Sequence, residues 1–125
     1  MSDQQSGGLG VAPNVGGLLC YAPCIGLVWA IVVLIVEKQS RFMRFHAVQS
    51  LLFLVAWTIV GVGVTMVSII AAFASSVLGW LIGLLAIPIH LGLLGLSIFM
   101  MVKAYGNEQF EIPVIGPMAK QWASN

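Results

Sequence analysis

Residues 45–102 read FHAVQSLLFLVAWTIVGVGVTMVSIIAAFASSVLGWLIGLLAIPIHLGLLGLSIFMMV, and they hold no Asp, Glu, Lys or Arg. A helix needs about 20 apolar residues to cross a hydrocarbon core of about 30 Å. This stretch is 58 residues long, which is enough for two spans and a turn between them. The sequence therefore predicts a membrane protein, with spans at about residues 47–74 and 77–102.

Upstream, residues 15–36 form another uncharged run of 22 residues, long enough to cross once. The segment before it has no Lys or Arg, whereas a secretory signal begins with a positive region. We therefore interpret the run as a retained helix. Residues 1–14, rich in Gly and small polar residues, are predicted to be a flexible tail. The predicted fold class is an all-α integral membrane protein with about three transmembrane helices in residues 15–103.

Composition and charge support this class. The chain is 60% hydrophobic and 7% charged, which lies outside the range of soluble domains. Its few cations are scattered, and this excludes a clustered basic surface for nucleic acid. All of them fall between the first two runs or after the last. With three spans, the positive-inside rule places these cations and the C-terminus in the cytoplasm and the N-terminus outside. The cations are Lys38, Arg41, Arg44, Lys103 and Lys120.

A four-span fold is the alternative topology. It requires a turn at Gly61 and Gly63 and a further division near residues 79–83. Its spans would be only about 16 to 18 residues long, near the lower limit for a crossing. It would also place Lys103 and Lys120 on the face opposite the other cations.

The segment between the first two runs, residues 37–50, reads EKQSRFMRFHAVQS and has an amphipathic pattern. Basic side chains beside a membrane reach anionic headgroups while aromatic rings rest on the acyl boundary. We expect an interfacial helix that leads into the second span. Its lipid-binding or partner-docking residues are predicted to be Lys38, Arg41, Arg44 and His46.

The last segment, residues 104–125, is predicted to be a cytoplasmic interfacial tail. A turn at residues 104–107 precedes apolar residues that free solution disfavours. Pro113 and Pro117 forbid a long helix across them. A short surface helix that Pro117 opens at its first position is therefore expected.

Small residues at helical spacing predict helix packing. Gly16, Cys20 and Cys24 recur every four residues, and Gly79 and Gly83 form a second pair. Small side chains let helices approach closely in lipid. The C-x3-C spacing differs from the C-x2-C redox motif, so packing is favoured, and a disulfide remains an alternative.

The two histidines are the candidate chemical groups. His46 lies at the interface and His90 mid-span, about 18 Å apart in depth at 1.5 Å per residue, so they cannot share a ligand. His90 is expected to be neutral and hydrogen-bonded to another helix, with the lining of a pathway beside a kink at Pro88 as the alternative. No carboxylate lies within the spans to act as a base. We therefore predict no catalytic, cofactor-binding or metal-binding residues, and no enzyme.

Two segments carry a resemblance: RFMRFHAVQSLL at residues 41–52 and FEIPVIGPMA at residues 110–119. With their spacing, they resemble the bacterial Tic-twenty-like family of small multipass membrane proteins. The resemblance implies a bacterial inner-membrane protein, and its chloroplast counterpart is associated with preprotein import. The expected function is a non-enzymatic scaffold or subunit, in a homo-oligomer or larger membrane complex, concerned with protein translocation or membrane-protein assembly. The alternative is a small oligomeric transporter or channel.

Overall fold

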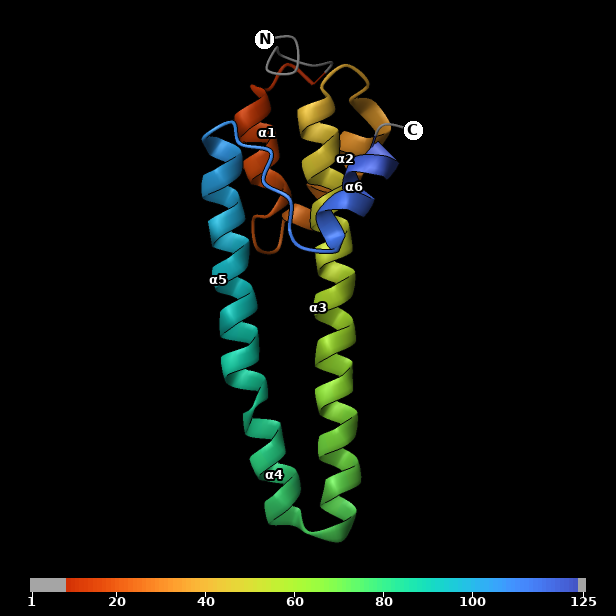
Figure 1. Cartoon of the computed structure of the whole chain (residues 1–125), viewed down its shortest axis with the longest axis vertical. Coiled ribbons are helices and arrows are strands. Elements are labelled where there is room, and N and C mark those ends of the chain that lie inside the picture. The colour runs from red at the N-terminus through yellow and green to blue at the C-terminus, as the bar shows by residue number, and fades with distance from the viewer. Residues whose placement is uncertain (1–8, 124–125) are drawn as a thin grey trace. The chain divides into compact units, whose positions relative to one another are not determined.

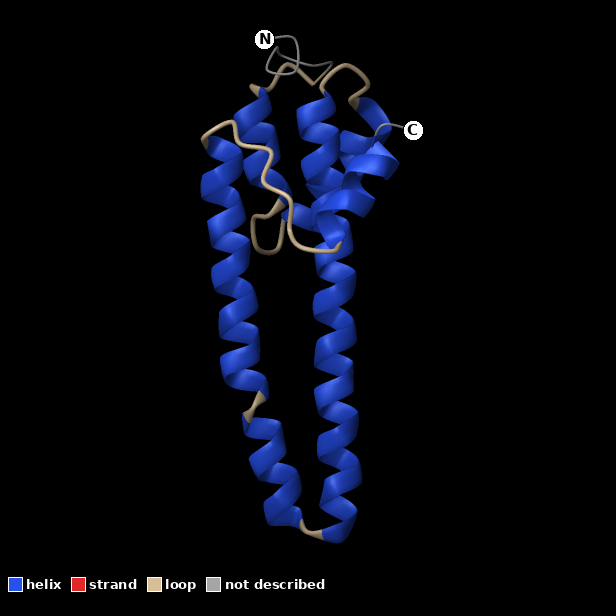
Figure 2. Ribbon diagram, viewed as in Figure 1, coloured by secondary structure: helices blue, strands red, loops and turns tan. Residues whose placement is uncertain are grey.

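The computed structural model describes residues 9–123, which are helical with no strand (Figures 1 and 2). The chain divides into two compact units. The terminal unit contains the residues up to Leu54 and from Ser97 onward, and the hairpin unit contains Val55–Leu96. The helices are α1 (Pro13–Cys20), α2 (Gly26–Val36), α3 (Arg41–Ala74), α4 (Ser76–Leu84), α5 (Ala86–Tyr105) and α6 (Ile115–Ala123).

Two helical stretches are long and apolar enough to cross a membrane: Arg41–Ala74 and Ser76–Tyr105. They correspond to the predicted second and third spans, which the sequence placed at about residues 47–74 and 77–102. Helix α3 continues without interruption through Gly61 and Gly63. The four-span alternative requires a turn at these glycines, and this prediction is therefore wrong.

In the hairpin unit, a turn at Ser75 reverses the chain between α3 and α4 (Figure 1). The Ser75 hydroxyl accepts a hydrogen bond from the Leu78 amide at 3.4 Å, at the N-cap of α4. Beside this turn, the Ser68 hydroxyl donates to the Gly79 carbonyl at 2.6 Å. A Cβ added at Gly79 would lie 2.6 Å from the Ala72 Cβ, so only glycine permits this close approach.

The helix that follows the turn is interrupted at Leu85, between α4 and α5 (Figure 2). Pro88 is the third residue of α5, and its ring removes the amide that would bond to the Leu84 carbonyl. Three residues before the proline, the Leu85 amide bonds to the Ile82 carbonyl at 3.0 Å, which is the i to i−3 bond of a tighter turn. The predicted bend is therefore present, three residues before the proline.

A third span is not confirmed. The run at residues 15–36 forms two short helices, α1 of 8 residues and α2 of 11 residues. The turn between them contains Pro23 and a Cys24 in the left-handed region, with φ of 70°. At Gly26 an added Cβ would lie 2.5 Å from the Cys20 carbonyl oxygen, so the chain reverses tightly here. Helices α1 and α2 consequently pack against each other as a helical hairpin (Figure 1).

The segment expected to be an interfacial helix leading into the second span, residues 37–50, forms the turn before α3 and the first turns of α3. The Ser40 hydroxyl accepts from the Met43 amide at 3.2 Å, as an N-cap does. The Glu37 carboxylate accepts from the amides of Gln39 and Ser40 and holds the preceding turn. The first turns of α3 are largely buried in the terminal unit. No break therefore separates the amphipathic segment from the span.

The predicted tail contains the expected turn and the expected short helix. Helix α5 ends at Tyr105, and α6 begins at Ile115, so Pro117 is its third residue rather than its first. Ala119 of α6 is buried against Phe45 and Val48 of α3. Of the predicted flexible tail, residues 1–8 lie outside the described residues, while Pro13 and Asn14 already belong to α1.

Candidate functional site

Four buried polar side chains of the terminal unit form a cluster, which we call the polar cluster. It consists of Tyr21, His46, Gln49 and Ser97, with exposed fractions of 4%, 0%, 0% and 6%. Tyr21 follows α1, and Ser97 belongs to α5. His46 and Gln49 are three residues apart on α3, so they share one face of that helix. Three separate parts of the sequence thus converge on this cluster.

Hydrogen bonds within the cluster form a directed chain. The Gln49 Nε2 donates to the Tyr21 hydroxyl at 2.8 Å. The Tyr21 hydroxyl lies 2.9 Å from the Nδ1 of His46. The Glu108 carbonyl, 3.2 Å from the His46 Nε2, can only accept a hydrogen bond, so Nε2 carries the proton of the neutral ring. In this tautomer Nδ1 accepts from the Tyr21 hydroxyl. Each donor in this series of hydrogen bonds is therefore matched to an acceptor.

The cluster also bonds to backbone that lies outside helices. Gln49 donates from Nε2 to the Phe110 carbonyl at 2.9 Å and accepts at Oε1 from the Ile112 amide at 2.9 Å. The Ser97 hydroxyl donates to the Tyr21 carbonyl at 2.8 Å. Non-helical backbone has no regular partners, and burying it without partners is costly. The cluster therefore provides hydrogen-bond partners for backbone groups in the turn after α1 and in the extended segment before α6.

The predicted docking residues occupy different environments. Lys38 and Arg41 are exposed, Arg44 is half-buried and His46 is fully buried. Arg44 donates from Nη1 to the carbonyls of Leu34 and Glu37, at 3.2 and 3.0 Å, at the end of α2. Cations stabilise the negative end of a helix dipole. The docking role itself stays a prediction, and Lys38 and Arg41 are its exposed members.

Of the residues predicted to form a packing ridge near the N-terminus, Gly16 and Cys20 pack within the chain, whereas Cys24 lies beyond the end of α1, so a ridge of all three residues is not formed. An added Cβ at Gly16 would lie 2.7 Å from the Met43 Cε. Its carbonyl accepts from the Trp29 indole at 2.8 Å, which fastens α2 to α1. The Cys20 thiol is buried and donates to the Gly16 carbonyl, whereas Cys24 is exposed in the turn. Both cysteines are free, so the disulfide alternative is not observed.

The predicted pair in the hairpin unit also packs within the chain. Gly79 lies against Ala72, and an added Cβ at Gly83 would lie 3.1 Å from the Ser68 hydroxyl. By contrast, an added Cβ at Gly92 or Gly95 would meet nothing within 4 Å. Two of the three open glycines of the hairpin unit therefore lie on α5, and the third is Gly63 on α3. The sequence analysis did not select the pair on α5.

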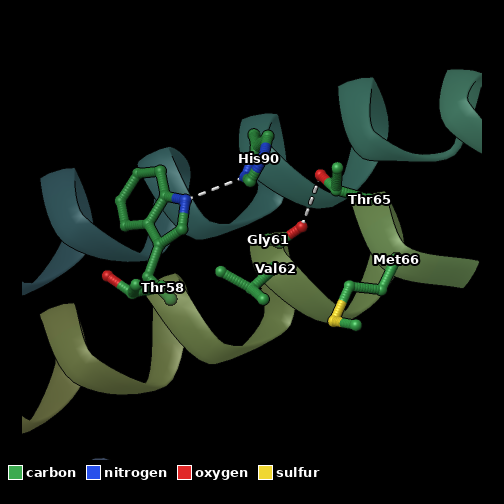
Figure 3. Close-up of a pocket in the computed structure, with 7 residues that line it drawn as sticks. Thr58, Gly61, Val62, Thr65, Met66 and His90 are labelled. Carbon is green, nitrogen blue, oxygen red and sulfur yellow. Dashed lines mark hydrogen bonds between the residues drawn. The ribbon is translucent and has the colours of Figure 1, made fainter. Parts of the chain in front are cut away.

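His90 forms the second polar feature, within the hairpin unit. Its Nδ1 accepts from the Trp57 indole at 2.8 Å, and the planes of the two rings lie 27° apart with centroids 6.1 Å apart (Figure 3). The expected hydrogen bond to another helix is therefore present. The pair borders a groove of about 390 Å³. The groove is lined by Trp57, Thr58, Gly61, Val62, Thr65, Met66 and His90.

Within residues 9–123, no group of three or more His, Cys, Asp and Glu side chains gathers in a way that could hold a metal ion. The sequence analysis singled out His46 and His90 but not their partners Tyr21 and Trp57, nor Ser97, which bonds to Tyr21. One feature of the sequence could have pointed to these partners: each polar side chain stands alone within an apolar run. An isolated polar group in such a run needs a hydrogen-bond partner, because lipid and apolar side chains offer none.

Comparisons with known proteins identify relatives of the chain. A model of the magnetosome magnetite crystal formation protein family (MamF/MmsF) matches residues 8–119. A UPF0132 membrane protein of Methanocaldococcus jannaschii is 39% identical over 115 residues, covering 92% of each chain. A UPF0132 membrane protein of Archaeoglobus fulgidus is 37% identical over 110 residues, covering 86% of this chain and 92% of its own length. No solved structure gives a significant match.

These matches correct the resemblance drawn from the sequence. The prediction of a bacterial Tic-twenty-like protein is wrong, because the matching family model is a different one and these relatives are archaeal. The two segments that carried the resemblance, residues 41–52 and 110–119, contribute to the polar cluster and to the α6 contact. Their pattern reflects how the terminal unit is held together.

Proposed function

Since the chain belongs to the magnetosome magnetite crystal formation protein family, with archaeal relatives named as membrane proteins, we propose that it is a non-enzymatic membrane scaffold. In this role it assembles with itself or with a larger membrane complex. The import role rested on the corrected resemblance and is not carried further. The family description concerns magnetite crystals, and organising the membrane around such a crystal is compatible with a scaffold.

The observation that carries this proposal is the bonding of the polar cluster. The side chains that could act as acid, base or ligand are engaged with one another and with the chain's own backbone. A catalytic group must reach a substrate proton or atom within hydrogen-bond distance. His46 is fully buried and both of its ring nitrogens are bonded. The arrangement supports a structural purpose for the cluster.

The surface of the hairpin unit supports assembly. In each candidate span, only 6% of the most apolar window is buried within the chain. Close approach at small residues drives helix association in lipid, where the hydrophobic effect does not. The open glycines Gly92 and Gly95 give α5 such a surface. We therefore assign self-association to this face of α5.

Orientation follows from the same two spans. Three of the five cations precede the first span or lie in its first turn, and the other two fall at the end of the second span or after it. Two spans return the chain to its starting side, so all five lie at one membrane face. The positive-inside rule assigns this face to the cytoplasm. Lys38 and Arg41 would there contact anionic headgroups or a partner.

The test is the size of the assembly in a mild detergent, measured by light scattering, together with crosslinking in the native membrane. We expect an oligomer or a defined complex. The double variant Gly92→Leu/Gly95→Leu should shift it toward monomer. Gly63→Leu adds one leucine side chain at an open position of α3, and it is compared with each single variant, Gly92→Leu and Gly95→Leu, as the matched control. A protein that stays monomeric and crosslinks to nothing contradicts the scaffold.

A small oligomeric transporter or channel is the second candidate, and the groove beside His90 is the observation that favours it. Ionisable groups within spans often mark a pathway. Proteoliposomes that conduct a solute or an ion, and lose this on His90→Ala, would support the transporter. Inert vesicles that contain correctly oriented protein would contradict it.

A further inference from the structure

Helix α2 presents an apolar face that none of residues 9–123 covers. It contains no charged residue, and the exposed fractions of its large side chains reach 67% at Ile35. Soluble proteins rarely expose an apolar patch of this size. The exposed residues are Leu27, Val28, Ile31, Ile35 and Val36, with Ile25 directly before the helix.

The length of α2 fits half a bilayer. At 1.5 Å per residue, 11 residues extend about 16 Å, roughly half of a hydrocarbon core of about 30 Å. Helix α1 is shorter, at 8 residues. Neither helix alone can cross, but the pair can enter and leave on one side.

Both ends of the α1–α2 hairpin are fastened at one end of the terminal unit. The Asn14 side chain at the start of α1 donates to the Tyr105 carbonyl at the end of α5, at 3.1 Å. Arg44, in the first turns of α3, bonds to the last carbonyls of α2. The start of α1 and the end of α2 therefore lie level with the start of α3 and the end of α5.

The tip of the hairpin lies deeper. The Tyr21 carbonyl and hydroxyl bond to Ser97 and Gln49. Ser97 is eight residues before the end of α5, and Gln49 is eight residues after the start of α3. Eight residues correspond to about 12 Å along each helix. The tip therefore lies about 12 Å inside the level at which the hairpin begins.

At the tip of the hairpin, backbone amides and a carbonyl form hydrogen bonds within the protein. The amides of Tyr21 and Ala22 bond to the carbonyls of Leu18 and Leu19, and the Gly26 amide bonds to the Ala22 carbonyl. Ser97 satisfies the Tyr21 carbonyl. Non-helical backbone at membrane depth is tolerated only where protein satisfies it or where it lines a water-filled cavity.

We propose that the α1–α2 hairpin is a re-entrant element, inserted into one leaflet with the acyl chains of that leaflet covering the exposed face of α2. The cations Lys38 and Arg41 lie just after α2, where they complement the anionic headgroups of that leaflet. The hairpin then returns the N-terminus to the face that holds Lys103 and the C-terminus. This reverses the outside N-terminus expected from three spans. The proposal does not depend on the scaffold role.

Cysteine labelling in sealed membrane vesicles of both orientations tests this topology. Single cysteines are placed at Ser2, Gln39 and Ser76 in a Cys20→Ala/Cys24→Ala background, and a membrane-impermeant maleimide is added. Ser2→Cys and Gln39→Cys should label from the same side, and Ser76→Cys from the opposite side. Labelling of Ser2→Cys from the side of Ser76→Cys overturns the proposal in favour of a full first span.

Native Cys24 supplies the second measurement, because it is exposed at the tip of the hairpin. In the Cys20→Ala protein, Cys24 should resist the maleimide from both sides of intact vesicles and react once detergent is added. Reaction in intact vesicles would show that the hairpin lies in water and would overturn the proposal. Protease removal of an N-terminal tag checks the side of the N-terminus without any cysteine variant.

Discussion

The terminal unit and the hairpin unit are both rich in apolar residues, yet they use them differently. The terminal unit buries large side chains, including Phe42, Met43, Phe45 and Met100, around its polar cluster. In the hairpin unit, Gly79 is the sole buried residue of 55–96. The terminal unit thus forms a specific interior of its own, whereas the hairpin unit depends on lipid or other helices to cover it. Substitutions should therefore act on the two units by different rules.

The largest expected effect is the loss of the Gln49 side-chain bonds. Gln49→Leu removes the partners of the Phe110 carbonyl and the Ile112 amide and one partner of the Tyr21 hydroxyl. Each buried polar group left without a partner costs about 1–3 kcal/mol, so the two backbone groups together predict a loss of about 2–6 kcal/mol. Denaturation in detergent measures the change, and limited proteolysis should find the segment before α6 released.

A matched control belongs to the hairpin unit. The Thr65 hydroxyl donates to the Gly61 carbonyl of its own helix at 2.9 Å, and the side chain is not buried. Thr65→Val should therefore change the free energy of unfolding by less than about 0.5 kcal/mol. Equal destabilisation by Gln49→Leu and Thr65→Val would contradict the contrast between the two units.

The next effect comes from the tightest contact of the hairpin unit. In Gly79→Val, the new side chain would meet the Ala72 Cβ and the Ser68 carbonyl oxygen, which lies 2.8 Å from an added Cβ. Backbone cannot move aside as a flexible side chain does, and overpacking costs about 1–3 kcal/mol. Thermal unfolding in detergent measures this. Gly92→Ala, made where nothing lies within 4 Å, should be neutral or slightly stabilising.

The sequence predicted the hairpin unit well because membrane crossing depends on length and charge alone. The uncharged stretch of residues 45–102 gave both candidate spans, and Pro88 gave the interruption near Leu85. The first run was assigned to a single span by the same rule, and this did not hold. Its length satisfied the rule, but Pro23 and the left-handed Cys24 break the helix. Length cannot distinguish one crossing helix from two short helices that return.

The terminal unit was harder to predict because its contacts join residues far apart in the sequence. His46 was selected as a headgroup-binding residue from the basic residues around it, whereas its partners are 25 and 62 positions away. Ser97 bonds to Tyr21 across 76 positions. A single sequence shows which residues need partners and not which residues meet. The resemblance captured the two segments involved but attached them to the wrong family.

A smaller effect is expected for the polar pair of the hairpin unit. Trp57→Phe removes the indole donor to His90 while it keeps an aromatic ring at this position. Hydrogen bonds between membrane helices contribute about 0.6 kcal/mol on average. Trp57→Phe should therefore destabilise the protein by about that amount, as unfolding in detergent micelles would show. A loss as large as that of Gln49→Leu would mean that the hairpin unit has a polar core of its own.

The smallest effect on stability is expected at the exposed cations. The Arg41 side chain is exposed, and Lys38 makes one exposed bond, from Nζ to the Leu34 carbonyl at 3.3 Å. The variant Lys38→Ala/Arg41→Ala should thus unfold like the parent protein. It should lose affinity for anionic lipid by about 1 kcal/mol per removed charge, measured by lipid copurification at low salt. Arg44→Ala is the informative contrast, because it leaves the α2 carbonyls without their cation and should destabilise the terminal unit. If all three cations behaved alike, the distinction between a surface cation and one that fastens the terminal unit would be wrong.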